Sequence, residues 1–105
     1  MRILVQTAPF DLGEETAAFA QGRGDMGAVV TFTGLVRGDG GLSAMEIEHY
    51  PGMTERAITA IAEEARERWS LGDVLVIHRH GRLEPGEAIM MVATAAPHRK
   101  DAFEA

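Results

Sequence analysis

The sequence contains no cysteine and only one lysine, Lys100, among its 105 residues. The lack of cysteine excludes disulfide bonds, thiol catalysis and cysteine-ligated zinc sites. Because nine of the ten basic residues are arginine, a mechanism that needs a lysine amine has a single candidate here. No apolar run approaches the roughly 20 residues that a membrane-spanning helix needs, and the first residues turn polar too soon for a signal peptide. We therefore expect a cytoplasmic protein without membrane contact.

The composition is that of one globular domain, with 46% hydrophobic and 25% charged residues. The net charge of −6 argues against a nucleic-acid partner, because such binding depends on phosphate neutralisation. Residues 76–100 nevertheless hold four basic and two acidic side chains, together with three of the four histidines. This local basic region fits a small anionic ligand, although ordinary scatter of surface charge explains it equally well.

Apolar patterning predicts an α+β fold, in which a mainly antiparallel sheet has both apolar-faced helices on one side. The Asp11 side chain is expected to cap the first helix and Thr54 the second. Gly34 inside a strand indicates a bulge or a close approach of the backbone, and residues 84–87 form the Pro-Gly turn of a hairpin. The predicted strands are 2–6, 27–36, 44–50, 73–80 and 88–95, and the predicted helices are about 13–21, about 55–70 and a third that Pro97 opens.

That third helix reaches Ala105 after about two turns, without a glycine or asparagine that would end it. Ala102 and Phe103 begin an apolar stripe that has no continuation. We expect that the chain stops within an element of a single domain, residues 1–105, which lacks its C-terminal segment. The alternative is a short terminal helix held by Phe103 alone.

Three potential cations, His98, Arg99 and Lys100, stand at the predicted start of this helix. A bound anion would stabilise them there, since helix N-termini and cations both favour phosphate. Arg37 leaves an apolar strand and enters a Gly-rich loop at 38–41, which is a common place for a ligand contact. The alternatives are a solvated first turn of the helix and an ordinary surface arginine.

His78 and His80 share one face of a predicted strand, a spacing that two metal ligands could use. No third ligand is evident, so we favour a structural role and expect no metal. The residues His49-Tyr50-Pro51-Gly52 form either a polar cluster or, more simply, a packed turn. Reasoning from these residues alone reaches a small α+β domain with a candidate anion site.

Several motifs carry a more specific signal. They are Gly27–Gly34 followed by Val36-Arg37, Glu48–Glu55, Val76–Arg79, Pro85–Glu87, and His98-Arg99 followed by Ala102–Ala105. In this order and over nearly the whole chain, they resemble the large, catalytic subunit of molybdopterin synthase. The resemblance implies an α/β-hammerhead fold, a mainly antiparallel sheet covered by two to three helices.

The activity that the resemblance implies is that of a sulfurtransferase in molybdenum cofactor biosynthesis. Two rounds of sulfur transfer to cyclic pyranopterin monophosphate would build the dithiolene of molybdopterin. The sulfur donor would be a small ubiquitin-like carrier subunit that ends in a Gly-Gly thiocarboxylate. A homodimer of the large subunit would bind two carriers as a heterotetramer, and no cofactor besides the substrate is implied.

The resemblance assigns substrate binding to Leu35, Val36, Arg37, His98 and Arg99. Arg37 and Arg99 would hold the substrate phosphate through charge-assisted hydrogen bonds, and His98 would donate to it or move a proton. Leu35 and Val36 would line the pocket, and Leu35 stands where many relatives have lysine.

The two lysines implied as catalytic in the family lie beyond the matched residues, and Lys100 matches neither. We therefore leave the catalytic residues unassigned and expect residues 1–105 alone not to turn over. The alternative is a non-catalytic module of the same fold that binds a pterin phosphate or another anion.

Overall fold

The structure is a computed structural model that describes residues 1–38 and 44–105. Most of the predicted Gly-rich loop at 38–41 therefore lies outside the described residues. The elements, in chain order, are β1 (Arg2–Gln6), α1 (Leu12–Ala20), β2 (Ala28–Leu35), β3 (Met45–Ile47), α2 (Met53–Arg68), β4 (Asp73–Arg79), β5 (Gly81–Leu83), β6 (Ala88–Ala96) and α3 (Arg99–Glu104).

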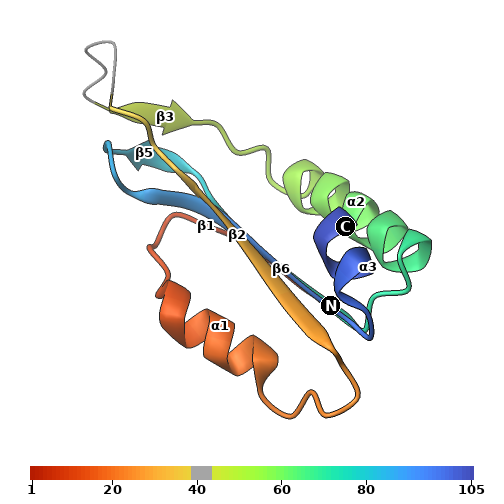
Figure 1. The fold of residues 1–105 in the computed structure, drawn as a ribbon. Helices are drawn as coiled ribbons and strands as arrows, with labels where there is room; N and C mark the ends of the chain where they lie inside the picture. Colours follow the sequence, from red (N-terminus) through yellow and green to blue (C-terminus); the bar gives the residue numbers. More distant parts are fainter. Residues whose placement is uncertain (39–43) are drawn as a thin grey trace.

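Four strands form the main sheet in the order β1-β4-β6-β2. The β1–β4 pair is parallel, and the β4–β6 and β6–β2 pairs are antiparallel. Strands β3 and β5 form a separate antiparallel pair beyond one end of the main sheet (Figure 1). The predicted α+β class with a mainly antiparallel sheet is confirmed.

The prediction that both apolar-faced helices cover one side of the sheet is wrong. Helix α1 packs on one face, where its Phe19 meets Leu75 and Ile77. Helices α2 and α3 pack on the other face, where Ala62 and Ala102 meet the opposite side chains of the same strands (Figure 1). Strands β4 and β6 are apolar on both faces, so each face needs a cover. No helix in the described part of the chain is long and apolar enough to cross a membrane.

The hairpin predicted around the turn at 84–87 is confirmed, because β4 and β6, the strands predicted at 73–80 and 88–95, pair antiparallel. The turn itself is present, with a 3.1 Å hydrogen bond from the Glu87 amide to the Glu84 carbonyl and a φ of 90° at Gly86. The strand before the turn, β5, pairs with β3 and not with β6. The three residues of β5 are too few to show an alternating pattern, so the sequence did not predict this strand.

The helix starts were predicted with mixed success. The Asp11 carboxylate accepts a 2.9 Å hydrogen bond from the Glu14 amide, as expected for a cap. Thr54 does not cap α2, which begins two residues earlier than predicted, at Met53, with Gly52 as its N-cap. Pro97 likewise precedes α3, whose N-cap is His98.

The Asp73 carboxylate joins the start of β4 to the N-terminal ammonium of Met1, 3.0 Å away, and to the Arg23 guanidinium. Partial burial acts to raise the pKa of Asp73. The hydrogen bonds from the Met1 ammonium and the Val74 amide, together with the positive charges of that ammonium and of Arg23, outweigh burial and lower the pKa overall. The resulting stabilisation of the folded state is present above the pKa that Asp73 has in the unfolded chain. It is lost as the pH falls through the lower pKa of Asp73 in the folded protein.

We therefore expect Asp73→Asn to lower the free energy of unfolding by about 1 kcal/mol at pH 7, since partial exposure screens the ion pairs. The difference should vanish at acid pH, where the wild-type carboxyl is protonated. Urea unfolding at both pH values measures this, with Asp25→Asn, at an exposed turn, as the control. An Asp73→Asn deficit that is independent of pH would contradict the electrostatic account.

Candidate functional site

The residues that the sequence assigns to substrate binding lie at opposite ends of one strand ladder. Arg37 follows β2, whose last residue, Leu35, pairs with Ala88 at the start of β6. His98 and Arg99 follow the other end of β6. The eight steps of β6 between these ends span roughly 25 Å. One copy of the chain therefore does not bring Arg37 and Arg99 together and has two separate cationic ends, the Arg37 end and the Arg99 end.

A bulge shapes the Arg37 end. The β2–β6 register shifts between Gly34 and Leu35, which confirms the irregularity predicted at Gly34. Leu35 is 58% exposed, and Val36 is buried beneath the turn at 84–87. The Val36 amide donates to the Glu87 carbonyl at 3.0 Å, and the Val36 carbonyl accepts from the Gly86 amide at 2.9 Å. Val36 therefore anchors the backbone, while the side chains of Leu35 and Arg37 reach the surface.

Two residues that the sequence patterns did not assign to the site, Arg79 and Glu87, organise this end. They form an ion pair at 3.3 Å. The pKa of Glu87 is lowered, mainly by the hydrogen bond from the Glu84 amide, with desolvation opposing it and Arg79 adding to it. The sequence does contain a signal for Arg79, because this charged residue occupies a strand position that faces the core, in line with Leu75 and Ile77.

The Arg99 end is held by backbone and buried side-chain contacts. The Gly27 amide donates to the Ala96 carbonyl at 3.0 Å, which fixes the chain as it leaves β6. The buried Thr94 hydroxyl donates to the Ala102 carbonyl at 2.7 Å and ties α3 back to the sheet. These contacts leave the side chains of His98 and Arg99 exposed.

Helix α3 has only six residues, so its dipole is weak. His98 is its N-cap residue, but the imidazole makes no capping hydrogen bond. The positive charge at this end is therefore carried by the side chains of Arg99 and Lys100, next to the His98 imidazole.

The other histidines serve local structure. The Nδ1 atom of His78 lies 2.9 Å from the Arg79 carbonyl oxygen. The His80 ring stacks on His49, with centroids 4.2 Å apart. No group of three or more metal-ligating side chains occurs in residues 1–38 and 44–105.

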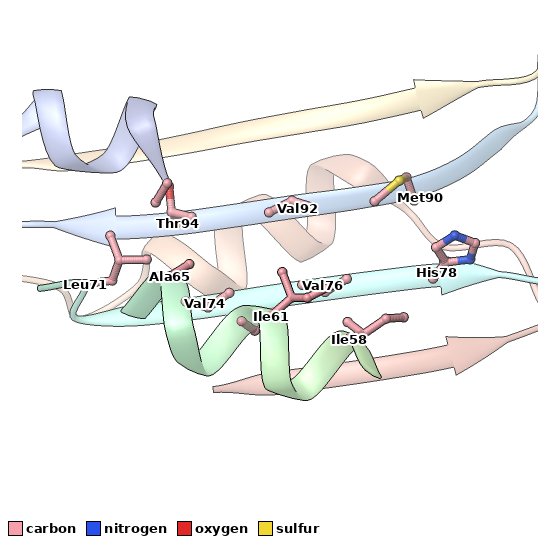
Figure 2. Close-up of a pocket in the computed structure, with 12 residues that line it drawn as sticks. Ile58, Ile61, Ala65, Leu71, Val74, Val76, His78, Met90, Val92 and Thr94 are labelled. Carbon is pink, nitrogen blue, oxygen red and sulfur yellow. The ribbon is translucent and has the colours of Figure 1, made fainter. Parts of the chain in front are cut away.

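An apolar cleft of about 250 Å³ lies between α2 and the sheet. Figure 2 shows Ile58 and Ile61 of α2 facing Val76 of β4 and Val92 of β6, with His78 at one end. None of the predicted substrate-binding residues lines this cleft, and its walls offer almost no polar group to a phosphate.

A second, shallow cleft on the same face of the sheet runs between β2 and α3. Its lining includes the aromatic side chains Phe32 and Phe103, which are 62% and 72% exposed. Aromatic side chains exposed to this degree are typical of a surface that another protein covers.

Comparisons with known proteins agree with these motifs. The model of the family described as MoaE protein matches residues 5–105. A relative from Cereibacter sphaeroides, named molybdopterin synthase catalytic subunit, is 70% identical over 106 residues, which cover 100% of this chain and 73% of the relative. A relative of the same name from Mesorhizobium japonicum is 55% identical, with 98% of this chain and 65% of the relative covered.

Solved structures give the same result for the fold. The Molybdopterin biosynthesis MoaE protein from Burkholderia ambifaria superposes with a TM-score of 0.90 at 50% sequence identity, covering 98% of this chain and 69% of that one. The family match over nearly the whole chain, the high identities and the shared fold lead to one conclusion: the chain belongs to the MoaE family.

Proposed function

We propose that this chain provides the substrate-binding domain of the catalytic subunit of molybdopterin synthase, a sulfurtransferase that converts cyclic pyranopterin monophosphate to molybdopterin. The observation that carries the proposal is the pair of exposed cationic ends, Arg37 and His98-Arg99, each held by backbone anchors in a chain of this family. Two relatives that are 70% and 55% identical to this chain are named molybdopterin synthase catalytic subunit.

The chemistry of the substrate fits these ends. Its phosphate is an anion, and an arginine guanidinium can bind two phosphate oxygens at once. Arg37 and Arg99 supply two such groups, and His98 adds a donor that can also move a proton. Leu35 contributes an apolar contact beside Arg37 at the exposed end of β2.

Both ends serve one substrate only if two copies of the chain meet, because roughly 25 Å separates the ends within one copy. A homodimer in which the two β2 strands lie antiparallel would set the Arg37 end of one copy beside the Arg99 end of the other. Strand β2 forms an edge of the main sheet, and the exposed Phe32 sits near its middle. Twofold symmetry would then create two equivalent sites.

The sulfur donor in this proposal is the carboxy-terminal thiocarboxylate of a small ubiquitin-like subunit. Each transfer forms a carbon–sulfur bond on the pterin side chain, where the sulfur displaces an oxygen substituent. The carbon–sulfur bond of the thiocarboxylate is broken with water, which leaves the donor as a carboxylate. One carrier for each large subunit gives a heterotetramer. The reaction takes place in the cytoplasm and needs no metal or further cofactor on this chain.

Turnover and binding can be tested separately. We expect residues 1–105, mixed with thiocarboxylated carrier, to bind the pterin precursor in calorimetry without forming the dithiolene. A chimera that adds the C-terminal residues of the Cereibacter sphaeroides relative should form it, because the implied catalytic lysines lie there. Failure of both proteins to bind the precursor would contradict the proposed function.

The second candidate is a non-catalytic module that binds the pterin phosphate. The observation that favours it is the single lysine of these residues, Lys100, which matches no catalytic lysine of the resemblance. Under this candidate the chimera binds the precursor but also fails to form the dithiolene. Dithiolene formation by residues 1–105 alone would instead show that the lysines beyond them are dispensable.

A further inference from the structure

Arg79 is the one charged side chain that is buried among the described residues, with 5% of its surface exposed. It ends β4 and contacts no predicted substrate-binding side chain through a hydrogen bond or ion pair. Burial of a guanidinium costs free energy unless its donors are satisfied. The contacts of Arg79 therefore show why an arginine is buried at this position.

The guanidinium joins three segments of the chain. Its Nε and Nη2 atoms donate to the Thr7 carbonyl, just after β1, at 3.2 and 3.1 Å. Its Nη1 atom donates to the Ala88 carbonyl at 3.1 Å and to the Glu87 carboxylate at 3.3 Å. Arg79 thus fastens the turn at 84–87 to the ends of β1 and β4.

The same turn holds the backbone that leads to Arg37. The second oxygen of the Glu87 carboxylate accepts a 2.7 Å hydrogen bond from the Glu84 amide and closes the turn. The backbone of Glu87 and Gly86 then pairs with both polar groups of Val36, the residue before Arg37.

Packing also holds the backbone that follows Arg37 against the turn at 84–87. A Cβ atom added to Gly38 would lie 2.9 Å from the Cβ of Pro85, so the segment runs flush against the turn. A continuous set of contacts therefore leads from the Arg79 guanidinium through the turn to the residues on both sides of Arg37.

We infer that Arg79 is a positioning residue for the Arg37 end of the substrate site, an inference that rests on the proposed function. Arg79 acts through the turn at 84–87 and does not touch the ligand. A bidentate guanidinium–phosphate contact depends steeply on direction and distance. Fixing the backbone on both sides of Arg37 sets the direction from which that contact is made.

A double-mutant cycle on the full chain tests this inference, with calorimetric affinity for cyclic pyranopterin monophosphate as the readout. We expect Arg79→Met to weaken binding about tenfold, because a displaced Arg37 guanidinium loses its charge-assisted contacts with the phosphate. In an Arg37→Ala background the same change should have almost no further effect. Affinity for the pterin without its phosphate should stay unchanged, which a general loss of structure would not produce.

Three further variants serve as controls. Arg82→Met removes the same charge from the exposed face of the neighbouring strand β5 and should leave affinity unchanged. Ile77→Val weakens the core from the same strand as Arg79, so it should lower the melting temperature without changing affinity. Arg79→Lys keeps the charge but loses the planar fork, and it should recover only part of the affinity.

If Arg79→Met does not fold, Glu87→Ala opens the same turn from a half-exposed side chain and should give the same phosphate-specific loss. Equal losses from Arg79→Met or Glu87→Ala with and without Arg37 would overturn the inference while the proposed function stands. No loss of affinity in Arg37→Ala itself would instead contradict the proposed site.

Discussion

Replacing Arg99 with alanine is expected to weaken the binding of cyclic pyranopterin monophosphate about thirtyfold. The side chain is exposed at the start of α3, and it supplies a charge-assisted contact to phosphate worth about 2 kcal/mol. Because the side chain carries no part of the core, the melting temperature should hardly change. Isothermal calorimetry on the folded variant measures the loss directly.

Arg66→Ala is the matched control for this result. Arg66 is exposed on α2 and belongs to neither cationic end, and its removal changes the net charge by the same amount. Any loss caused by net charge alone would appear in both variants, and added salt would abolish it. Equal affinities of the Arg66→Ala and Arg99→Ala variants would remove Arg99 from the site.

The second large effect is expected from Gly27→Ala. A Cβ atom at this position would lie 2.1 Å from the Pro97 carbonyl oxygen, which belongs to the backbone and cannot rotate away. The clash must displace the segment between β6 and α3. We expect a loss of about 2 kcal/mol in the free energy of unfolding, together with weaker substrate binding, since His98 and Arg99 follow this segment.

Gly24→Ala provides the comparison, because an added Cβ there meets no heavy atom within 4 Å. This variant should be as stable as the wild type, or more stable by about 0.5 kcal/mol, through the entropy of the unfolded chain. Chemical denaturation of the wild type and the two variants measures both changes in the free energy of unfolding. If Gly27→Ala and Gly24→Ala are equally stable, the close approach at Pro97 does not constrain the Arg99 end.

Local patterns in the sequence predicted the elements well where side-chain periodicity was strong. The apolar run that became β6 was correctly predicted as a buried central strand, and the capping by Asp11 was confirmed. The stripe on α2 was correct for Ala62 but wrong for Ile61, which is 68% exposed and lines the apolar cleft of Figure 2. Periodicity locates the apolar side of a helix but not how far a neighbouring element covers it.

Long-range pairing could not be predicted in the same way. Strand β5 pairs with β3, which lies more than 30 residues earlier in the chain, and neither three-residue strand carries a register signal. The separation of Arg37 from His98 and Arg99 follows from the antiparallel β2–β6 register, which local sequence does not reveal. The resemblance assigned substrate binding to residues near two strand ends, and only the register shows that one copy cannot bring Arg37 and Arg99 together.

The central claim is that Arg37 of one copy and Arg99 of another form one substrate site. Variants Arg37→Ala and Arg99→Ala, mixed in equal amounts and allowed to exchange subunits, test it by calorimetric counting of tight sites for cyclic pyranopterin monophosphate. Half of the dimers are then mixed, and each contains one intact site, so the account predicts about a quarter of the wild-type number of tight sites. A mixture with no more tight sites than the separate variants would contradict it.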